Sequence, residues 1–216
     1  MGLDKFTSII GQLKNWPGDR IKVLKLCIYG EPLINPEFPK MLEIAQAANI
    51  AERIETTTNA SLLSAEIAHA MVRNKLDYVR VSIYAADNQR HNEITGSPIR
   101  IEQIRNNLKV LQEIKRQAAS YRPFVCAKML DTYDAPQNEA FLNLYKDVAD
   151  ELFIDKPHSW IKTDQADFLG KYYADKLKLA KEEFNKNSTK RVACPMAFTT
   201  MAIRSNGDVS PCCVDF

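Results

Sequence analysis

The 216-residue sequence lacks any apolar run near the roughly 18 to 20 residues that span a bilayer, and no signal-peptide core opens it. Phe6 stands where the myristoylation pattern needs Ser or Thr. A large excess of charge of one sign is also absent, because 29 basic and 27 acidic residues give a net charge of +2. That balance gives no electrostatic reason to expect a nucleic acid or an anionic membrane as partner. We therefore expect a cytoplasmic protein with neither partner.

Cysteine is scarce, and its five residues form an odd number. Without a secretory signal, this argues against a disulfide framework. Three of them, Cys194, Cys212 and Cys213, crowd near the C-terminal end, which indicates metal or redox chemistry there. Internal repeats and low-complexity segments are absent as well.

What the sequence does contain is an alternation of strand-like and helical runs. The predicted strands are 21–29, 54–58, 77–85, 124–130 and 152–154, and the predicted helices are 3–15, 37–48, 65–74, 101–119 and 138–150. The clearest helix is 101–119, whose apolar stripe consists of Ile101, Ile104, Leu108, Leu111 and Ile114. Ser64 is the expected N-cap of 65–74. This alternation is typical of βαβ units, hence of an α/β protein with a parallel sheet and helices outside.

The C-terminal part has a different composition. Residues 156–190 are polar and lysine-rich, and we expect a linker with an amphipathic helix near 165–184. Beyond residue 191, Asn206-Gly207 lies between two short strand-like runs, which predicts a β-hairpin. A two-residue turn would pair Ser205 with Asp208 and place Met201 opposite Cys212.

Polar residues stand where three of the predicted strands end: Gly30-Glu31-Pro32, Asn59 and Ser82. Ligands of parallel α/β proteins bind outside the carboxyl ends of the strands. Taken alone, Gly30-Glu31-Pro32 is more simply a turn that needs glycine and proline. Asn59 and Ser82 alone are ordinary strand-end residues.

In sequential order, however, these residues form a recognisable set. Gly30-Glu31-Pro32, then Thr57-Thr58-Asn59-Ala60, then Val81-Ser82-Ile83, resemble the radical S-adenosylmethionine (SAM) enzymes. Cys194, Gly207 and Cys212 resemble the opening half of the SPASM/Twitch auxiliary-cluster motif.

The resemblance implies a fold and a division of the chain. Residues 1–155 are expected to form a partial (β/α)6 TIM-like barrel that lacks its first strand. Residues 156–190 would be a helical linker, and residues 191–216 the start of a SPASM/Twitch-like domain with its β-hairpin. The chain would then be truncated at both ends.

The resemblance also implies roles for the strand-end residues. The Gly30-Glu31-Pro32 turn would bind the SAM amino group through its backbone and carboxylate. An ammonium group favours such fixed acceptors. Ser82 would contact the SAM ribose or carboxylate, and Asn59 would line the same cavity.

The sequence departs from the family pattern at several positions. Tyr29 and Ala60 replace glycines, and the arginine expected shortly after His91 is absent. Arg90 and Arg100 are candidates for the missing partner of the SAM carboxylate.

The family's CxxxCxxC, which binds the SAM-ligating [4Fe–4S] cluster, is not in this sequence. Such a cluster needs about three or four thiolates. Cys27 and Cys126 are more simply small buried apolar residues. No catalytic residue is identifiable, and the chain as given is predicted to be inactive.

For the parent protein, the resemblance implies a radical SAM enzyme. It would bind SAM at a [4Fe–4S] cluster, generate a 5′-deoxyadenosyl radical and modify a peptide or a small molecule. Flavodoxin or ferredoxin would donate the electron. Cys194 and Cys212 would be ligands of an auxiliary [4Fe–4S] cluster.

Two alternatives remain open from the sequence. One is a non-catalytic barrel that has lost the cluster and acts as a binding module. The other is a zinc-stabilised interaction protein with ligands from Cys194, Cys212, Cys213 and a histidine, although the short C-x-x-C spacing is missing.

Overall fold

The computed structural model of the protein describes residues 1–156, residue 182 and residues 194–212. The main sheet consists of β1 (Ile21–Lys25), β2 (Ala51–Thr58), β3 (Tyr78–Ile83), β4 (Phe124–Leu130) and β5 (Glu151–Asp155). The helices of this part are α1 (Leu3–Lys14), the 3-10 helix η1 (Pro32–Ile34), α2 (Phe38–Ala48), α3 (Ala65–Arg73), α4 (Asn88–Thr95), α5 (Ile101–Gln117) and α6 (Ala135–Tyr145). A C-terminal segment contains α8 (Met196–Thr199), β6 (Ala202–Ile203) and β7 (Val209–Ser210).

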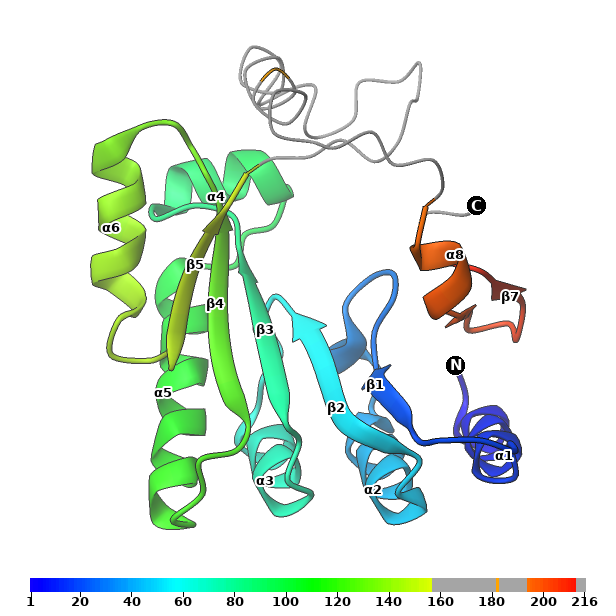
Figure 1. The fold of residues 1–216 in the computed structure, drawn as a ribbon. Coiled ribbons are helices and arrows are strands. Elements are labelled where there is room, and N and C mark those ends of the chain that lie inside the picture. The colour runs from blue at the N-terminus through cyan, green and yellow to red at the C-terminus, as the bar shows by residue number, and fades with distance from the viewer. Residues whose placement is uncertain (157–181, 183–193, 213–216) are drawn as a thin grey trace.

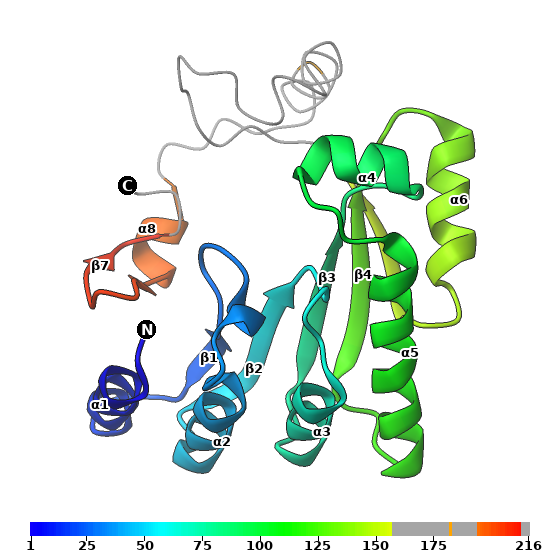
Figure 2. The same cartoon turned by 180° about the vertical axis from the view of Figure 1, so that it is seen from behind.

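The five strands form one parallel sheet in the order β1-β2-β3-β4-β5. Figures 1 and 2 show α2, α3 and α5 on the same face of this sheet. Each parallel pair needs a crossover connection, and the helices between the strands supply it. The α/β class and the parallel sheet with external helices are therefore confirmed.

The core lies between the sheet and the helices. On β3, Val79, Val81 and Ile83 are buried, whereas the alternating Arg80 and Ser82 are only half-buried. All five members of the predicted α5 stripe are buried, so that prediction is confirmed. At the start of α3, Ile67 N donates to Ser64 Oγ (3.2 Å), which confirms the predicted N-cap.

The strand predicted over 21–29 is wrong in length, because β1 ends at Lys25. Leu26 N still donates to Glu55 O (2.8 Å), but the chain then leaves the ladder. Thr57 N donates to Cys27 Sγ (3.2 Å), so a thiol accepts the hydrogen bond that a backbone carbonyl of β1 would accept in a continued ladder. This early exit creates the exposed loop that leads to Gly30.

Two helices differ from the prediction. Helix α4 was not predicted, since its residues are mostly polar; Arg90 N donates to Asp87 Oδ1 (2.8 Å) at its start, and Gly96 ends it with φ +64°. Helix α6 covers 135–145 rather than 138–150, with Pro136 in its first turn. The predicted helix at 165–184 lies outside the described residues apart from residue 182. No helix in the described part of the chain is long and apolar enough to cross a membrane.

The C-terminal hairpin forms with a register one residue away from the prediction. Ala202 pairs with Ser210 and Ile203 with Val209. Arg204 N donates to Asp208 O (2.8 Å), so the loop contains three residues and not two, with Gly207 at φ +99°. The predicted pairs Ser205–Asp208 and Met201–Cys212 are therefore wrong.

Candidate functional site

The loop after β1 carries Glu31 to the ends of the neighbouring strands. Gly30 has φ +75°, a conformation that glycine adopts without a steric penalty. Glu31 is the N-cap of η1, and Leu33 N donates to Glu31 Oε1 (3.0 Å). Tyr29 is not among the described residues with positive φ, so a side chain is compatible with the backbone there.

The Glu31 carboxylate links this loop to the end of β2. Its Oε1 accepts from Thr58 Oγ1 (2.6 Å) as well as from Leu33 N. Its Oε2 accepts from Asn59 N (2.7 Å). A carboxylate offers about four acceptor positions. The hydrogen bonds among the described residues therefore leave about one acceptor position, on Oε2, for a ligand.

The turn after β2 is held by its own side chains and by α5. Ala60 is buried with φ +56°, which explains why a glycine suits this position; alanine there costs about 1 kcal/mol. Thr58 Oγ1 accepts from Ala60 N (2.9 Å), and Asn59 Oδ1 accepts from Ser61 N (2.9 Å). Asn107 Nδ2 donates to the carbonyl oxygens of Ala60 (2.9 Å) and Ser61 (3.1 Å).

Ser82 lies on the next strand at the same edge. Thr58 pairs with Val81, so Asn59 and Ser82 are neighbours at the carboxyl ends of β2 and β3. On its other side Ser82 pairs with Lys128 of β4. The structure therefore brings Gly30, Glu31, Asn59 and Ser82 to one edge of the sheet.

Sequence reasoning missed two residues of this edge, Thr58 and Tyr84. Tyr84 follows Ser82 by two residues, and the two-residue period of a strand could have identified it. Its partial burial, together with the charge of Glu31, raises the pKa of Tyr84 and keeps the phenol protonated. The signal for Thr58 was weaker, because a threonine within a β-branched run is typical of any strand.

His91 of α4 packs against Tyr84 near this edge. Its ring lies 6.4 Å from that of Tyr84 in an edge-to-face arrangement, and its side chain is buried with Nδ1 unbonded among the described residues. Burial lowers the pKa of His91.

We expect acid to destabilise the protein through His91. An unfolded histidine takes up a proton near pH 6.5, whereas the folded state resists protonation until a lower pH. The unfolded state then binds more protons, so the free energy of unfolding falls below about pH 6.5 by up to about 1.4 kcal/mol per pH unit. Urea unfolding at pH 7.5 and 5.5 measures this loss, and H91F should reduce it.

The matched control is H69F, since His69 is an exposed histidine of α3. It should keep the acid sensitivity of the wild type. Equal sensitivity of H91F and wild type would contradict the assignment to His91.

The two arginines considered for the SAM carboxylate already have carboxylate partners. Arg100 Nε donates to Glu102 Oε2 (3.2 Å), and Arg90 Nη1 lies 3.8 Å from Glu93 Oε2. Their role toward SAM stays a prediction.

The cysteines of the C-terminal segment do not form a complete metal site in the described residues. Cys194 is exposed before α8, and Cys212 is half-buried after β7. No group of three His, Cys, Asp or Glu residues is arranged for a metal ion in residues 1–156, 182 and 194–212. Cys213 lies outside those ranges. Cys126 is buried, as expected, whereas Cys27 is only half-buried.

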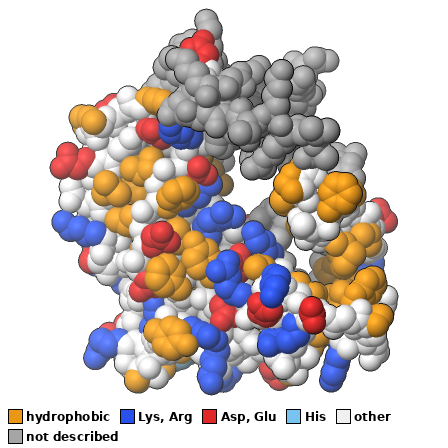
Figure 3. Space-filling model, viewed as in Figure 1, with side chains coloured by type: hydrophobic (Ala, Val, Ile, Leu, Met, Phe, Trp, Pro, Cys, Tyr) orange, Lys and Arg blue, Asp and Glu red, His pale blue; other side chains and the backbone are white. Residues whose placement is uncertain are grey.

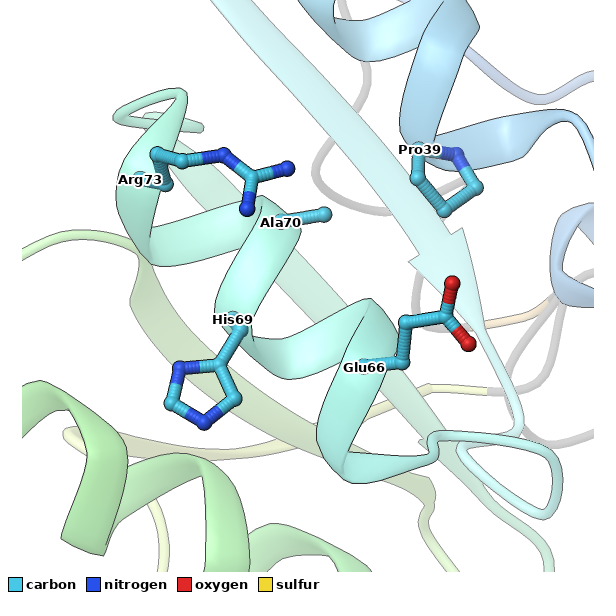
Figure 4. Close-up of a pocket in the computed structure, with 5 residues that line it drawn as sticks. All are labelled: Pro39, Glu66, His69, Ala70 and Arg73. Carbon is cyan, nitrogen blue, oxygen red and sulfur yellow. The ribbon is translucent and has the colours of Figure 1, made fainter.

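A shallow pocket of about 430 Å³ lies elsewhere, on the helical layer. Figure 4 shows Pro39 of α2 facing α3, which contributes Glu66, His69, Ala70 and Arg73. The pocket belongs to the face of the sheet that the helices cover. It contains none of the residues of the Glu31 edge.

The fold is similar to that of several solved proteins. Across 97% of this chain and 52% of the other, it resembles the crystal structure of Streptococcus suis SuiB bound to S-adenosylmethionine (18% identity, TM-score 0.63). It also resembles native anSMEcpe with bound AdoMet, across 99% and 66% of the two chains (17% identity, TM-score 0.62). A further structure holds anSMEcpe with AdoMet and the Kp18Cys peptide (15% identity, TM-score 0.63, 100% and 67% covered). At these identities the likeness shows the fold alone.

The chain spans about half to two thirds of the length of these proteins. A search of curated proteins found no matching sequence. The sequence model described as "Radical SAM superfamily" matches residues 5–123, which is more than half of the chain. The chain therefore belongs to the radical SAM superfamily.

Proposed function

We propose that the full-length protein is a radical SAM enzyme and that the edge formed by Gly30-Glu31-Pro32, Asn59 and Ser82 binds SAM. The observation that carries this proposal is the Glu31 carboxylate, held by Thr58 and Asn59 with about one acceptor position left on Oε2. A carboxylate fixed in this way suits the ammonium group of SAM. No hydrogen bond joins the Ser82 hydroxyl to another described residue, so this hydroxyl can form a hydrogen bond with the ribose or the carboxylate of SAM.

The same proposal extends to the architecture. The five strands would be part of a partial (β/α)6 barrel over residues 1–155, followed by a linker over 156–190. Residues 191–216 would begin a SPASM/Twitch domain whose auxiliary [4Fe–4S] cluster takes Cys194 and Cys212 as ligands. The separation of these cysteines by a β-hairpin supports this assignment.

These 216 residues do not fit the SAM-ligating [4Fe–4S] cluster. They contain no CxxxCxxC; Cys27 lies in the loop after β1, and Cys126 lies on β4. The proposal therefore requires cluster ligands outside these 216 residues. Reading the coding sequence upstream of Met1 for a CxxxCxxC tests this requirement.

Substrate and partners are part of the same proposal. A peptide substrate is favoured by the related anSMEcpe, whose structure contains AdoMet and a peptide. An electron donor such as flavodoxin or ferredoxin and a cytoplasmic location complete the proposal.

The deciding experiment is anaerobic reconstitution of the full-length protein. We expect bound iron and sulfide, SAM binding by calorimetry, and 5′-deoxyadenosine after reduction. Protein that binds SAM but no iron would instead indicate a binding module that has lost the cluster. Zinc in place of iron, without SAM binding, would indicate the zinc-stabilised interaction protein.

A further inference from the structure

The face of the sheet that points away from the helices, here called the inner face, is rich in charged side chains. The strand registers place the following residues on it: Lys25, Arg53, Glu55, Tyr78, Arg80, Ser82, Cys126, Lys128, Glu151, Phe153 and Asp155. Figure 3 views the molecule from this side and shows basic side chains gathered in its middle, beside hydrophobic side chains.

Most cations of the inner face already have a carboxylate partner. Glu55 pairs with both Lys25 (3.7 Å) and Arg53. Lys128 pairs with Asp155. Two cations thus share Glu55, which leaves this part of the face with excess positive charge.

Arg80 differs from these residues. It is half-buried on β3, yet its guanidinium makes no hydrogen bond or ion pair with any residue in the described part of the chain. Its neighbours in register are Thr57 on one side and Cys126 on the other. Glu151 pairs with Cys126 and so lies two strands away, roughly 10 Å by the spacing of strands.

A partly buried guanidinium without a counter-charge is unfavourable, because it loses water without gaining a carboxylate. Its five N–H groups form a planar fork that matches a carboxylate. The folded chain gains no evident stability from this arginine, so its position points to a ligand with a negative charge.

We propose that Arg80 binds a carboxylate of the substrate and that the substrate is an acidic peptide. This inference rests on the proposed function. Arg80 precedes Ser82 by two residues, roughly 7 Å along the strand. A substrate carboxylate bound to Arg80 therefore places the backbone of the peptide close to the proposed SAM edge. Phe124 and Phe153 are exposed on the inner face of β4 and β5 and can take apolar neighbours of the acidic residue.

The test compares two tripeptides with the full-length protein, with and without SAM. The first is N-acetylated, C-amidated Phe-Glu-Phe, and the second carries glutamine in place of glutamate. We expect the wild type to bind the acidic peptide about tenfold more tightly, the size of one charged hydrogen-bonded contact. R80Q should bind both peptides equally, and R80K should keep part of the preference.

The matched control is R53Q, since Arg53 lies on the same face but already pairs with Glu55. It should keep the preference for the acidic peptide. In urea, R80Q should unfold at the same or a higher concentration than the wild type, because Arg80 has no partner among the described residues to lose.

Equal affinity of the wild type for the two peptides would overturn the proposal. So would an R80Q variant that keeps the preference but binds SAM tenfold more weakly, because Arg80 would then hold the carboxylate of SAM. Failure of the wild type to bind SAM contradicts the proposed function, and it is read separately from the peptide preference.

Discussion

E31A is expected to lower the free energy of unfolding by about 3 kcal/mol and to weaken SAM binding by at least about tenfold. The carboxylate accepts hydrogen bonds from Leu33 N, Thr58 Oγ1 and Asn59 N. A hydrogen bond to a charged group contributes about 1.5 to 3 kcal/mol when buried. Glu31 is half-buried, so water offsets part of the loss of all three.

Two further variants make the Glu31 result specific. E31Q keeps the shape and one acceptor oxygen, so its effects should be intermediate. E37A removes a single hydrogen bond to Leu3 N (3.0 Å) in the same region and should leave SAM binding intact. Urea unfolding and calorimetry measure the two properties, with binding measured where each variant is folded. A folded E31A that binds SAM like the wild type would contradict the assignment of Glu31.

D150A is expected to cost about 3 kcal/mol of unfolding free energy for a different reason. Asp150 Oδ2 accepts from the buried Lys115 Nζ of α5 (2.7 Å) and from Val125 N of β4 (2.7 Å). Lys115 is buried whereas Asp150 is partly exposed, so removing Asp150 leaves a buried ammonium group without compensation. The substitution also leaves an amide unpaired at the start of β4.

The double variant K115M/D150A separates the charge from the amide. It removes the uncompensated ammonium and should recover much of the stability lost in D150A. The matched control D147A breaks the more exposed pair with Arg105 and should cost at most about 1 kcal/mol. Urea unfolding of the four proteins gives the comparison, and a loss in D150A no larger than in D147A would contradict a buried-charge effect.

The sequence predicted the regular parts of the fold because their patterns are local. The α5 stripe and the β4 boundaries depend on periodicity within one segment, and both agree with the structure. The predicted end of β1 disagrees with the structure. The strand ends early where Cys27 Sγ accepts from Thr57 N, thirty residues away, and no local pattern indicates this contact. The polar α4 has no apolar stripe to reveal it, and the hairpin register depends on whether Asn206-Gly207 makes a two- or three-residue loop.

The candidate edge was predictable as a set of strand-end positions. A parallel sheet brings Asn59 and Ser82 together whatever their side chains do, whereas Gly30 and Glu31 reach this edge through the loop after β1. The pattern could not indicate that the Glu31 carboxylate accepts hydrogen bonds from Thr58 and Asn59. Nor could it indicate that Arg80 has no counter-charge among the described residues, since this depends on which carboxylates the neighbouring strands place nearby.

The contacts of Asn107 with the turn after β2 have a consequence for ligand binding. Asn107 Nδ2 donates hydrogen bonds to the carbonyl oxygens of Ala60 and Ser61. Asn107 lies on α5, which is the longest helix among the described residues. The Asn59 turn is therefore anchored to a rigid element before any ligand arrives. Ordering a side chain on binding costs about 0.5 to 1.5 kcal/mol, and a preorganised edge avoids that loss. Affinity at this edge can then reflect the contacts themselves rather than the closure of a loop.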